Sequence, residues 1–209
     1  MARYIGPDCR LCRREREKLF LKGEKCLTNR CVMVKRGSPP GQAVILRATI
    51  TEYGLRLRAK QRLKRIYGLF ESQFRRFFDL TGRQRAIPRG EKLIELLERR
   101  LDNVLYRLGF APSRDSARQL VTHGHIVIND SKVYAPSYIT RVGDVLKLSA
   151  DIVRTPQIQQ HLESIKSRSI PPWLELLPDG LSGRVVELPK RSMVDIPVDE
   201  RLVVEFYSR

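Results

Sequence analysis

The stretch that decides the fold is residues 99–148, RRLDNVLYRLGFAPSRDSARQLVTHGHIVINDSKVYAPSYITRVGDVLKL. In its first half, apolar side chains recur three and four residues apart, which predicts helices, and in its second half they alternate with polar ones, which predicts strands. We expect one helix over 91–108 and a second that begins after Ser113, its N-cap, and ends at Gly124. The predicted strands are 126–128, 132–133 and 145–148. Together these elements predict a helix-turn-helix followed by a small antiparallel sheet.

The flanking segments show the same two periodicities. Apolar residues over 50–79 have helical spacing, and Gly68 is expected to divide this segment into two helices. Residues 158–165 are also predicted to be helical. The segment 202–206 alternates as LVVEF, which predicts a final strand. Trp173, after two prolines, is interpreted as a core anchor.

The charge points to a polyanionic partner. The 209 residues contain 40 Lys and Arg against 23 Asp and Glu, for a net charge of +17 and a pI near 10.3. Residues 1–90 hold 23 basic and 7 acidic side chains, so most non-specific attraction to nucleic acid is expected there. An enzyme that acts on small acidic metabolites rarely needs so large a positive charge. No apolar stretch approaches the roughly 18 residues of a membrane span, and no signal peptide is evident, so we expect no membrane partner and a reducing compartment.

All four cysteines lie near the N-terminus in two close pairs, Cys9 with Cys12 and Cys26 with Cys31. This spacing predicts one tetrahedral Zn site that staples a segment too short of apolar residues to bury its own core. Four thiolates would fill the coordination sphere, so the site would be structural. The alternatives are reduced thiols or two disulfides, and, less in keeping with the pattern, a redox pair.

The central stretch resembles the RNA-binding domain named after bacterial small-subunit ribosomal protein four. The residues that carry the resemblance are RLDN (100–103), YRLGFA (106–111), Ser113, ARQ (117–119), HGHI (123–126), Asn129, PSY (136–138) and GD (143–144). The flanks resemble the same ribosomal family, in LRAKQRL (57–63), IYGL (66–69), QF (73–74), LP (188–189) and VEFYSR (204–209). A subset of that family also carries the four cysteines. The chain departs from the family at 42–46, where a His-Gly and a more basic stretch are usual, and at 129–130, where Asn-Asp replaces Asn-Gly.

The resemblance and the patterns together predict an α+β fold with a zinc-stapled N-terminal arm, a helical domain and an inserted helix-turn-helix plus small antiparallel sheet. The expected domains are a basic zinc-binding arm over 1–45, a helical ribosomal-RNA-binding domain over 46–98 that 166–209 continues, the RNA-binding domain over 99–165, and a C-terminal extension over 166–209 that ends in a strand.

Arginines at helical spacing predict an RNA-binding face across the two helices of residues 99–148, since guanidinium forks bind phosphates well. Three further arginines line up on one side of the helix before them. An ordinary solvated helix face is the alternative for any single arginine. The predicted RNA-binding residues are Arg3, Arg13, Arg14, Lys22, Arg58, Lys60, Arg62, Lys64, Arg65, Arg99, Arg100, Asn103, Arg107, Arg114, Arg118, Gln119, His123, His125, Asn129 and Lys132.

The histidines and acids within this stretch have predicted roles without catalysis. His123 and His125 flank Gly124 at a helix end, where their rings are available to stack on or hydrogen-bond RNA, and a metal pair is the alternative. Asp102 is interpreted as an orienter of arginine or backbone groups, and Asp144 as a turn residue. We expect no catalytic residue and no small-molecule substrate.

The leading hypothesis is a structural protein of the small ribosomal subunit whose main partner is ribosomal RNA. The rivals are an RNA-modifying enzyme that carries this domain as an appendage, and a zinc-dependent DNA-binding regulator. The resemblance further implies early RNA binding that nucleates assembly of the subunit body, contact with small-subunit protein five, influence on decoding accuracy, proximity to messenger RNA and, in some members, repression of their own operon. It also implies a cytoplasmic, ribosomal location in bacteria, with plastids as the alternative.

Overall fold

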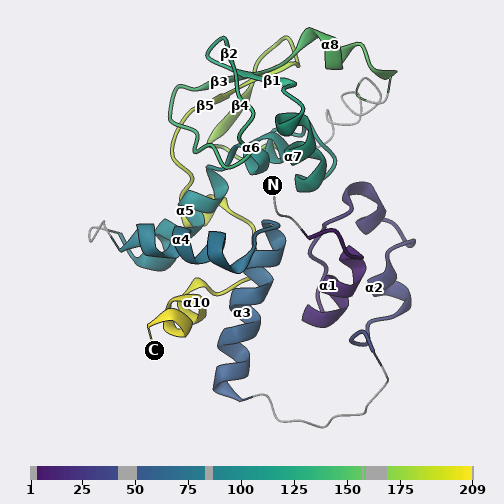
Figure 1. The fold of residues 1–209 in the computed structure, drawn as a ribbon, viewed down its shortest axis with the longest axis vertical. Helices are drawn as coiled ribbons and strands as arrows, with labels where there is room; N and C mark the ends of the chain where they lie inside the picture. The colour runs from purple at the N-terminus through teal and green to yellow at the C-terminus, as the bar shows by residue number, and fades with distance from the viewer. Residues whose placement is uncertain (1–3, 42–50, 83–86, 157, 159–168, 209) are drawn as a thin grey trace. The chain divides into compact units, whose positions relative to one another are not determined.

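A computed structural model describes residues 4–41, 51–82, 87–156, 158 and 169–208 (Figure 1). The chain divides into two compact units, one of Met1–Leu93 with Ile196–Arg209 and one of Ile94–Asp195. None of the helices in the described ranges combines the length and the apolar character of a membrane span.

The first unit is helical. Its elements are α1 (Asp8–Glu15), the 3-10 turn η1 (Gly23–Cys26), α2 (Val32–Lys35), α3 (Glu52–Ile66), α4 (Glu71–Thr81), the start of α5 (Arg89–Glu98) and α10 (Glu200–Tyr207). Thr51 caps α3, since its hydroxyl accepts a hydrogen bond from the Gly54 amide at 3.2 Å. Gly68, with a φ of 63°, separates α3 from α4, which confirms the predicted break.

The C-terminal segment is a helix, so the predicted strand over 202–206 is wrong. The Asp199 carboxylate accepts a hydrogen bond from the Arg201 amide at 2.9 Å and caps α10. Val203 is fully buried, and α10 lies along α3 (Figure 1). The sequence LVVEFY is compatible with both the two-residue period of a strand and the 3.6-residue period of a helix. Packing of one helical face against α3 decides for the helix.

The second unit contains a five-stranded antiparallel sheet in the order β2-β1-β3-β5-β4. Its elements are α6 (Leu101–Arg107), α7 (Arg114–Thr122), β1 (Ile126–Ile128), β2 (Ser131–Lys132), β3 (Val145–Leu148), α8 (Ala150–Val153), β4 (Leu174–Leu176), β5 (Ser182–Val185) and η2 (Arg191–Met193). The predicted second helix and the predicted strands at β1 and β3 are confirmed. Most of the helix predicted over 158–165 lies outside the described residues.

The single helix predicted over 91–108 is instead two helices, α5 and α6. Arg100 has the extended dihedrals φ −64° and ψ 136° and forms an isolated β-bridge with Ile139. The Leu101 amide donates to the Tyr138 carbonyl at 2.9 Å, and the Thr140 amide donates to the Arg99 carbonyl at 2.9 Å. This pairing with residues distant in sequence replaces intrahelical hydrogen bonds and breaks the helix.

The sheet also extends beyond the predicted domain of 99–165, because β4 and β5 come from the expected C-terminal extension. Leu146 pairs with Gly183 across β3 and β5. A Cβ on Gly183 would lie 2.6 Å from a methyl group of Leu108, so glycine lets α6 approach the sheet closely. Of the described C-terminal residues, 169–195 therefore belong with the sheet and 196–208 belong with the helical unit.

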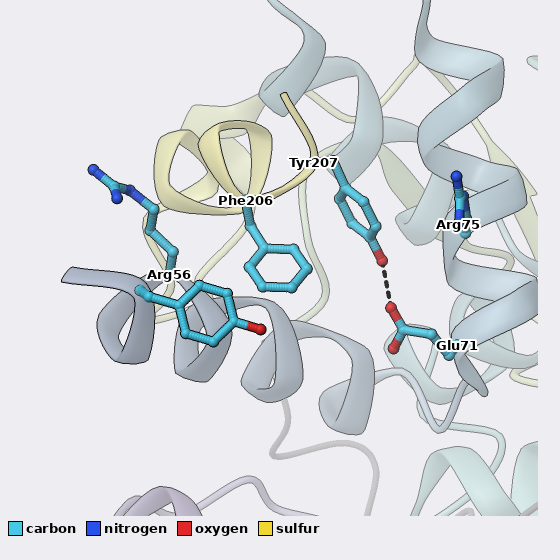
Figure 2. Close-up of a pocket in the computed structure, with 6 residues that line it drawn as sticks. Arg56, Glu71, Arg75, Phe206 and Tyr207 are labelled. Carbon is cyan, nitrogen blue, oxygen red and sulfur yellow. Dashed lines mark hydrogen bonds between the residues drawn. The ribbon is translucent and has the colours of Figure 1, made fainter. Parts of the chain in front are cut away.

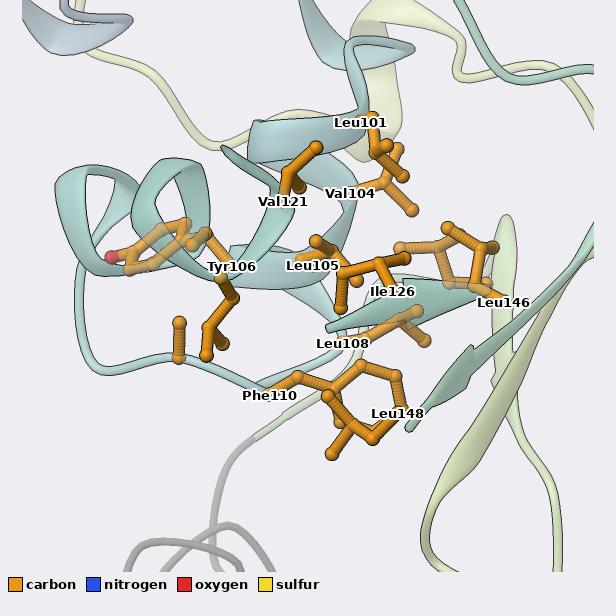
Figure 3. Close-up of a cluster of buried hydrophobic side chains, with 14 of the residues drawn as sticks. Leu101, Val104, Leu105, Tyr106, Leu108, Phe110, Val121, Ile126, Leu146 and Leu148 are labelled. Atoms are coloured by element: carbon orange, nitrogen blue, oxygen red, sulfur yellow. The ribbon is translucent and has the colours of Figure 1, made fainter. Parts of the chain in front are cut away.

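The core of the second unit lies between α6, α7 and one face of the sheet (Figure 3). Along β3, Leu146 and Leu148 are buried while Lys147 between them is exposed, as expected for a sheet with one covered face. Trp173 is fully buried in this core, which confirms its interpretation as an anchor. The core fixes the faces that α6 and α7 can present to a partner.

Candidate nucleic-acid interface

The end of α7 forms an exposed surface of imidazole and phenol rings. Gly124 has a φ of 76° and ends the helix as predicted. The rings of His123 and His125 lie 6.1 Å apart with an interplanar angle of 17°. Tyr134 packs over Gly124, where an added Cβ would come within 2.5 Å of the phenol ring. Exposed flat rings of this kind suit unpaired bases.

Polar and basic side chains continue this surface. Gln119, His123 and Lys132 are exposed, and His125 and Arg114 are half-buried. Asn129 is exposed too, but its amide donates to Asp144 at 2.9 Å and its side-chain oxygen accepts from the Val145 amide at 3.0 Å. Asn129 therefore holds the turn together, and the prediction of Asp144 as a turn residue is confirmed.

Two of the predicted phosphate-binding arginines are buried inside the second unit. Arg100 is 2% exposed and donates to both carboxylate oxygens of Asp102, at 3.1 and 2.6 Å. Arg118 is 7% exposed and donates to the same carboxylate at 3.3 Å. Arg100 and Arg118 therefore do not belong to an exposed RNA-binding face of α6 and α7, and the prediction is corrected for both. Their ion pairs with Asp102 keep both guanidinium groups away from solvent. Asp102 orients arginines as predicted.

A second buried carboxylate, Glu98, organises the neighbouring polar residues. Arg107 binds it with two hydrogen bonds of 3.0 and 2.8 Å, and Asn103 donates to it at 2.7 Å. Asn103 is 1% exposed, so its predicted RNA contact is also corrected. Arg99, just after α5, donates to the Thr140 carbonyl at 2.9 Å and pairs with Glu95 of α5 at 3.0 Å.

The arginines that line up along α3 in the first unit bind the N-terminal arm. Arg58 donates to Glu15 of α1 at 3.2 Å, and Arg65 pairs with the same buried carboxylate. Arg62 pairs with Glu17 at 2.8 Å. Burial lowers the pKa of Arg65, while Glu15 favours its charged form. The predicted phosphate-facing row on α3 is therefore corrected to a row of internal ion pairs.

Two predicted lysines of α3 share one carboxylate on α4. Lys60 donates to Glu71 at 2.5 Å and Lys64 donates to it at 2.8 Å. Tyr207 also donates to Glu71, at 2.7 Å (Figure 2). Burial by itself would raise the pKa of Glu71, but these three hydrogen bonds lower it to about 2. Lys60 is buried and lies 4.4 Å from the centre of the Phe206 ring, which makes its role internal.

A cavity of about 420 Å³ lies next to this cluster, and Figure 2 shows side chains that line it. Its lining residues are Tyr53, Arg56, Glu71, Arg75, Phe206 and Tyr207. The rings of Tyr53 and Phe206 lie 5.8 Å apart. Arg56 lines the rim and pairs with Glu205 at 2.7 Å and with Glu52 at 3.1 Å.

The N-terminal arm presents the remaining predicted cations. Arg13 donates to the carbonyls of Ser38 and Pro39 at 2.8 and 3.1 Å, so it stabilises the arm. Arg14 is exposed, and Lys22 is exposed at 3.8 Å from Asp8. Arg3 lies outside the described residues. Arg14 and Lys22 are thus the predicted cations of the arm that the structure leaves accessible.

No disulfide joins the four cysteines of the arm in this structure. Cys12, Cys26 and Cys31 are buried, and the Lys22 amide donates to the Cys26 sulfur at 3.4 Å. Burial raises the pKa of Cys12, the Leu19 amide lowers it, and the nearby Cys26, Cys9 and Cys31 raise it again. In the parts of the chain that the structure describes, no three His, Cys, Asp or Glu side chains stand in a metal-binding arrangement.

The acids that bind several partners at once are the residues that sequence reasoning missed. Glu15, Glu71 and Glu98 each collect two or more cationic or amide partners from other elements. For Glu15 and Glu71, the available signal was the local scarcity of acid, since residues 1–90 contain only 7 carboxylates beside 23 cations. Carboxylates in so basic a segment are expected to attract partners, but which cations reach them is decided by the tertiary structure.

Comparison with known proteins gives matches along the whole chain. Residues 3–98 match the family model described as ribosomal protein S4/S9 N-terminal domain, and residues 99–146 match the S4 domain. The chain is 53% identical to small ribosomal subunit protein uS4 of Dictyoglomus turgidum over 210 residues, with 100% of each chain covered. It is 49% identical to uS4 of Acetivibrio thermocellus and 51% identical to uS4 of a Thermoanaerobacter species, again with 100% coverage of each chain.

Proposed function

Because the chain belongs to the uS4 family of small ribosomal subunit proteins, we propose that it is a structural constituent of that subunit and binds ribosomal RNA there. The observation that carries this conclusion is the similarity over 100% of the chain, which includes both the N-terminal family domain and the S4 domain. The net charge of +17 supplies the attraction that a polyanionic partner requires.

The chain is not an enzyme. Every part of it aligns with ribosomal proteins, so the rival of an RNA-modifying enzyme with an appended RNA-binding domain is abandoned. The rival of a DNA-binding regulator predicts equal or better binding to duplex DNA, and competition between RNA and DNA at one salt concentration separates it from the proposal.

The proposed interface of the second unit consists of accessible side chains on α7, between α7 and β1, and on β2. Arg114 supplies a guanidinium for phosphate, Gln119 an amide, Lys132 an ammonium, and His123 and His125 flat rings for unpaired bases. In the first unit, the exposed Arg14 and Lys22 supply further cations. These residues support the proposal because they keep access to solvent, whereas the other predicted cations within the described residues pair internally.

The family resemblance supports a more specific role. We propose that the protein binds the RNA early and nucleates assembly of the subunit body, contacts small-subunit protein five, lies near messenger RNA and contributes to translational accuracy. Its expected location is the cytoplasmic ribosome of a bacterium.

We also propose that Cys9, Cys12, Cys26 and Cys31 hold one structural Zn. The donor set of four cysteine sulfur atoms fits Zn, and the Lys22 amide donates a hydrogen bond to the Cys26 sulfur. When bound, the metal would cross-link the two cysteine pairs of the arm. The arm buries Cys12, Cys26 and Cys31, and Cys9 is half-buried.

Footprinting on small-subunit RNA tests the proposed function. With the full-length chain at fixed salt, we expect protection confined to one junction of that RNA and weaker, unlocalised protection of a random duplex. The variant Gln119→Ala with His123→Ala is expected to weaken the local footprint, while Arg184→Ala, an exposed cation on β5, serves as a matched control. Equal affinity for the specific and the random RNA would contradict the proposal.

A further inference from the structure

A line of hydrogen bonds connects the end of α5 with the beginning of α7. The side-chain amide of Asn103 donates to the Glu98 carbonyl at 2.9 Å and to the Glu98 carboxylate at 2.7 Å. The side-chain oxygen of Asn103 accepts a hydrogen bond from Nε of Arg114 at 2.8 Å. The order is therefore Glu98, then Asn103, then Arg114, with one hydrogen-bonded step between neighbours.

The amide of Asn103 satisfies these partners in one orientation only. Turning it over would direct its oxygen at the two Glu98 acceptors and its NH₂ group at the Arg114 donor. Glu98 is 0% exposed and Asn103 is 1% exposed, so water does not replace the lost partners. Because unsatisfied buried polar groups are strongly disfavoured, Glu98 determines the direction in which the Asn103 oxygen points.

Arg114 is held on a second side by an aromatic ring. Its guanidinium carbon lies 4.4 Å from the centre of the Tyr106 ring. The hydrogen bond to Asn103 and the contact with Tyr106 together define both the position and the plane of the guanidinium group. Arg114 nevertheless stays half-buried at the start of α7 and retains access to solvent.

We infer that Glu98 and Asn103 are positioning residues that orient the Arg114 guanidinium for an RNA phosphate. This inference rests on the proposed RNA-binding function and explains why two buried polar residues occupy this place. A guanidinium with a fixed plane matches phosphate with two parallel hydrogen bonds and loses little freedom on binding. A long side chain without such support would have to be ordered by the RNA itself.

We call the line of hydrogen bonds from Glu98 through Asn103 to Arg114 the relay. A double-mutant cycle in the full-length chain tests it, with small-subunit RNA as the probe. Arg114→Ala is expected to weaken binding about tenfold, as for the loss of one charge-assisted contact. Glu98→Gln replaces one carboxylate oxygen by an NH₂ group and removes the negative charge, which weakens the side-chain acceptor of the Asn103 amide while its hydrogen bond to the backbone carbonyl stays. It should weaken binding by about fivefold. In the Arg114→Ala background, Glu98→Gln should have no further effect, because the oriented group is gone.

A spectroscopic readout separates positioning from general destabilisation. The Nε–H resonance of Arg114 should be sharp and protected from exchange in the native chain and broadened by Glu98→Gln. Glu95→Gln is the matched control, since Glu95 is a buried carboxylate of the same helix that pairs with Arg99. It should leave that resonance unchanged. If Glu98→Gln fails to fold, Tyr106→Leu, which removes the supporting ring, takes its place. It should weaken RNA binding in the native chain and should cause no further loss of binding in the Arg114→Ala background.

The outcomes distinguish the relay from the proposed function. Additive losses from Glu98→Gln and Arg114→Ala, with native binding intact, would overturn the relay alone. Native affinity in Arg114→Ala would also overturn it. Failure of the native chain to prefer small-subunit RNA would instead overturn the proposed function on which the relay depends.

Discussion

Tyr207, near the end of α10, donates a hydrogen bond from its phenolic oxygen to Oε1 of Glu71 on α4 at 2.7 Å. The same carboxylate accepts hydrogen bonds from Lys60 and Lys64 on α3. One side chain thus connects three helices, including the C-terminal helix of the chain. Burial and the negative charge of Glu71 raise the pKa of Tyr207, so the phenol remains a donor at all ordinary pH values.

The Glu71 carboxylate makes the stability of the helical unit dependent on pH in the acidic range. The pKa of Glu71 is lowered from 4.5 to about 2 in the folded chain, so its contribution is present above pH 4.5 and is lost as pH falls toward 2. Its side chain is 45% exposed, and after allowance for solvent screening we expect about 1 kcal/mol. Urea unfolding of native chain and Glu71→Gln should show their difference shrinking over that range. Glu52→Gln, at a 78% exposed side chain, is the control, and parallel pH profiles for native chain and Glu71→Gln would contradict the prediction.

Arg100 is expected to stabilise the second unit by its ion pair, without contacting RNA directly. Arg100→Ala leaves Asp102 buried with a weaker partner, and breaking a buried pair in this way costs about 3–5 kcal/mol. Arg184→Ala, on the exposed face of β5, should stay within about 0.5 kcal/mol of the native chain. Chemical denaturation measures both. A stable Arg100→Ala chain with weakened RNA binding would restore the original phosphate-binding interpretation.

The turn between β1 and β2 contains removable backbone strain. Asn129 and Asp130 both have positive φ, 46° and 66°, as a type I′ turn requires. Asp130→Gly removes the Cβ penalty in this region and should stabilise the unit by about 1 kcal/mol. The expected readout is a higher urea midpoint with an unchanged slope. Ser131→Gly, one residue later in β2, should stabilise nothing, and equal gains from both variants would argue against turn strain.

The two units should differ in the salt dependence of RNA binding. Residues 94–195 hold 14 basic and 12 acidic side chains, whereas the rest of the chain holds 26 and 11. Each neutralised phosphate contributes about −0.7 to −0.9 to the slope of log K against log salt. A fragment of residues 94–195, with its folding verified by circular dichroism, should therefore show a much shallower slope than the full chain. Identical slopes would mean that the first unit contributes no phosphate contacts.

Zinc should be present at one atom per chain after purification under reducing, chelator-free conditions. Removing it, or changing Cys26 to Ser, should lower the thermal stability of the arm, because the metal replaces the core that this segment lacks. Elemental analysis and protection from proteolysis measure the two effects. His123→Ala should retain the metal. A metal-free chain from such a preparation, or a native Cys9–Cys12 disulfide, would contradict the zinc proposal.

The local sequence determined the elements whose signals come from neighbouring residues. Ser113 caps α7 with its own side chain, Gly68 and Gly124 occupy positive φ, and the alternation in β1 and β3 selects the buried face. The charge and the dense family resemblance likewise follow from the sequence alone. These features depend on contacts between residues close in sequence or on composition alone.

Tertiary structure decided the remaining features. The break at Arg100 depends on pairing with residues 138–140, and the helix over 200–207 depends on packing against α3. Helical spacing placed arginines on one face but did not reveal which carboxylates would reach them. Because ion pairs such as Arg107 with Glu98 and Arg65 with Glu15 join residues 9 and 50 positions apart, only the folded chain separates cations used internally from those left for RNA.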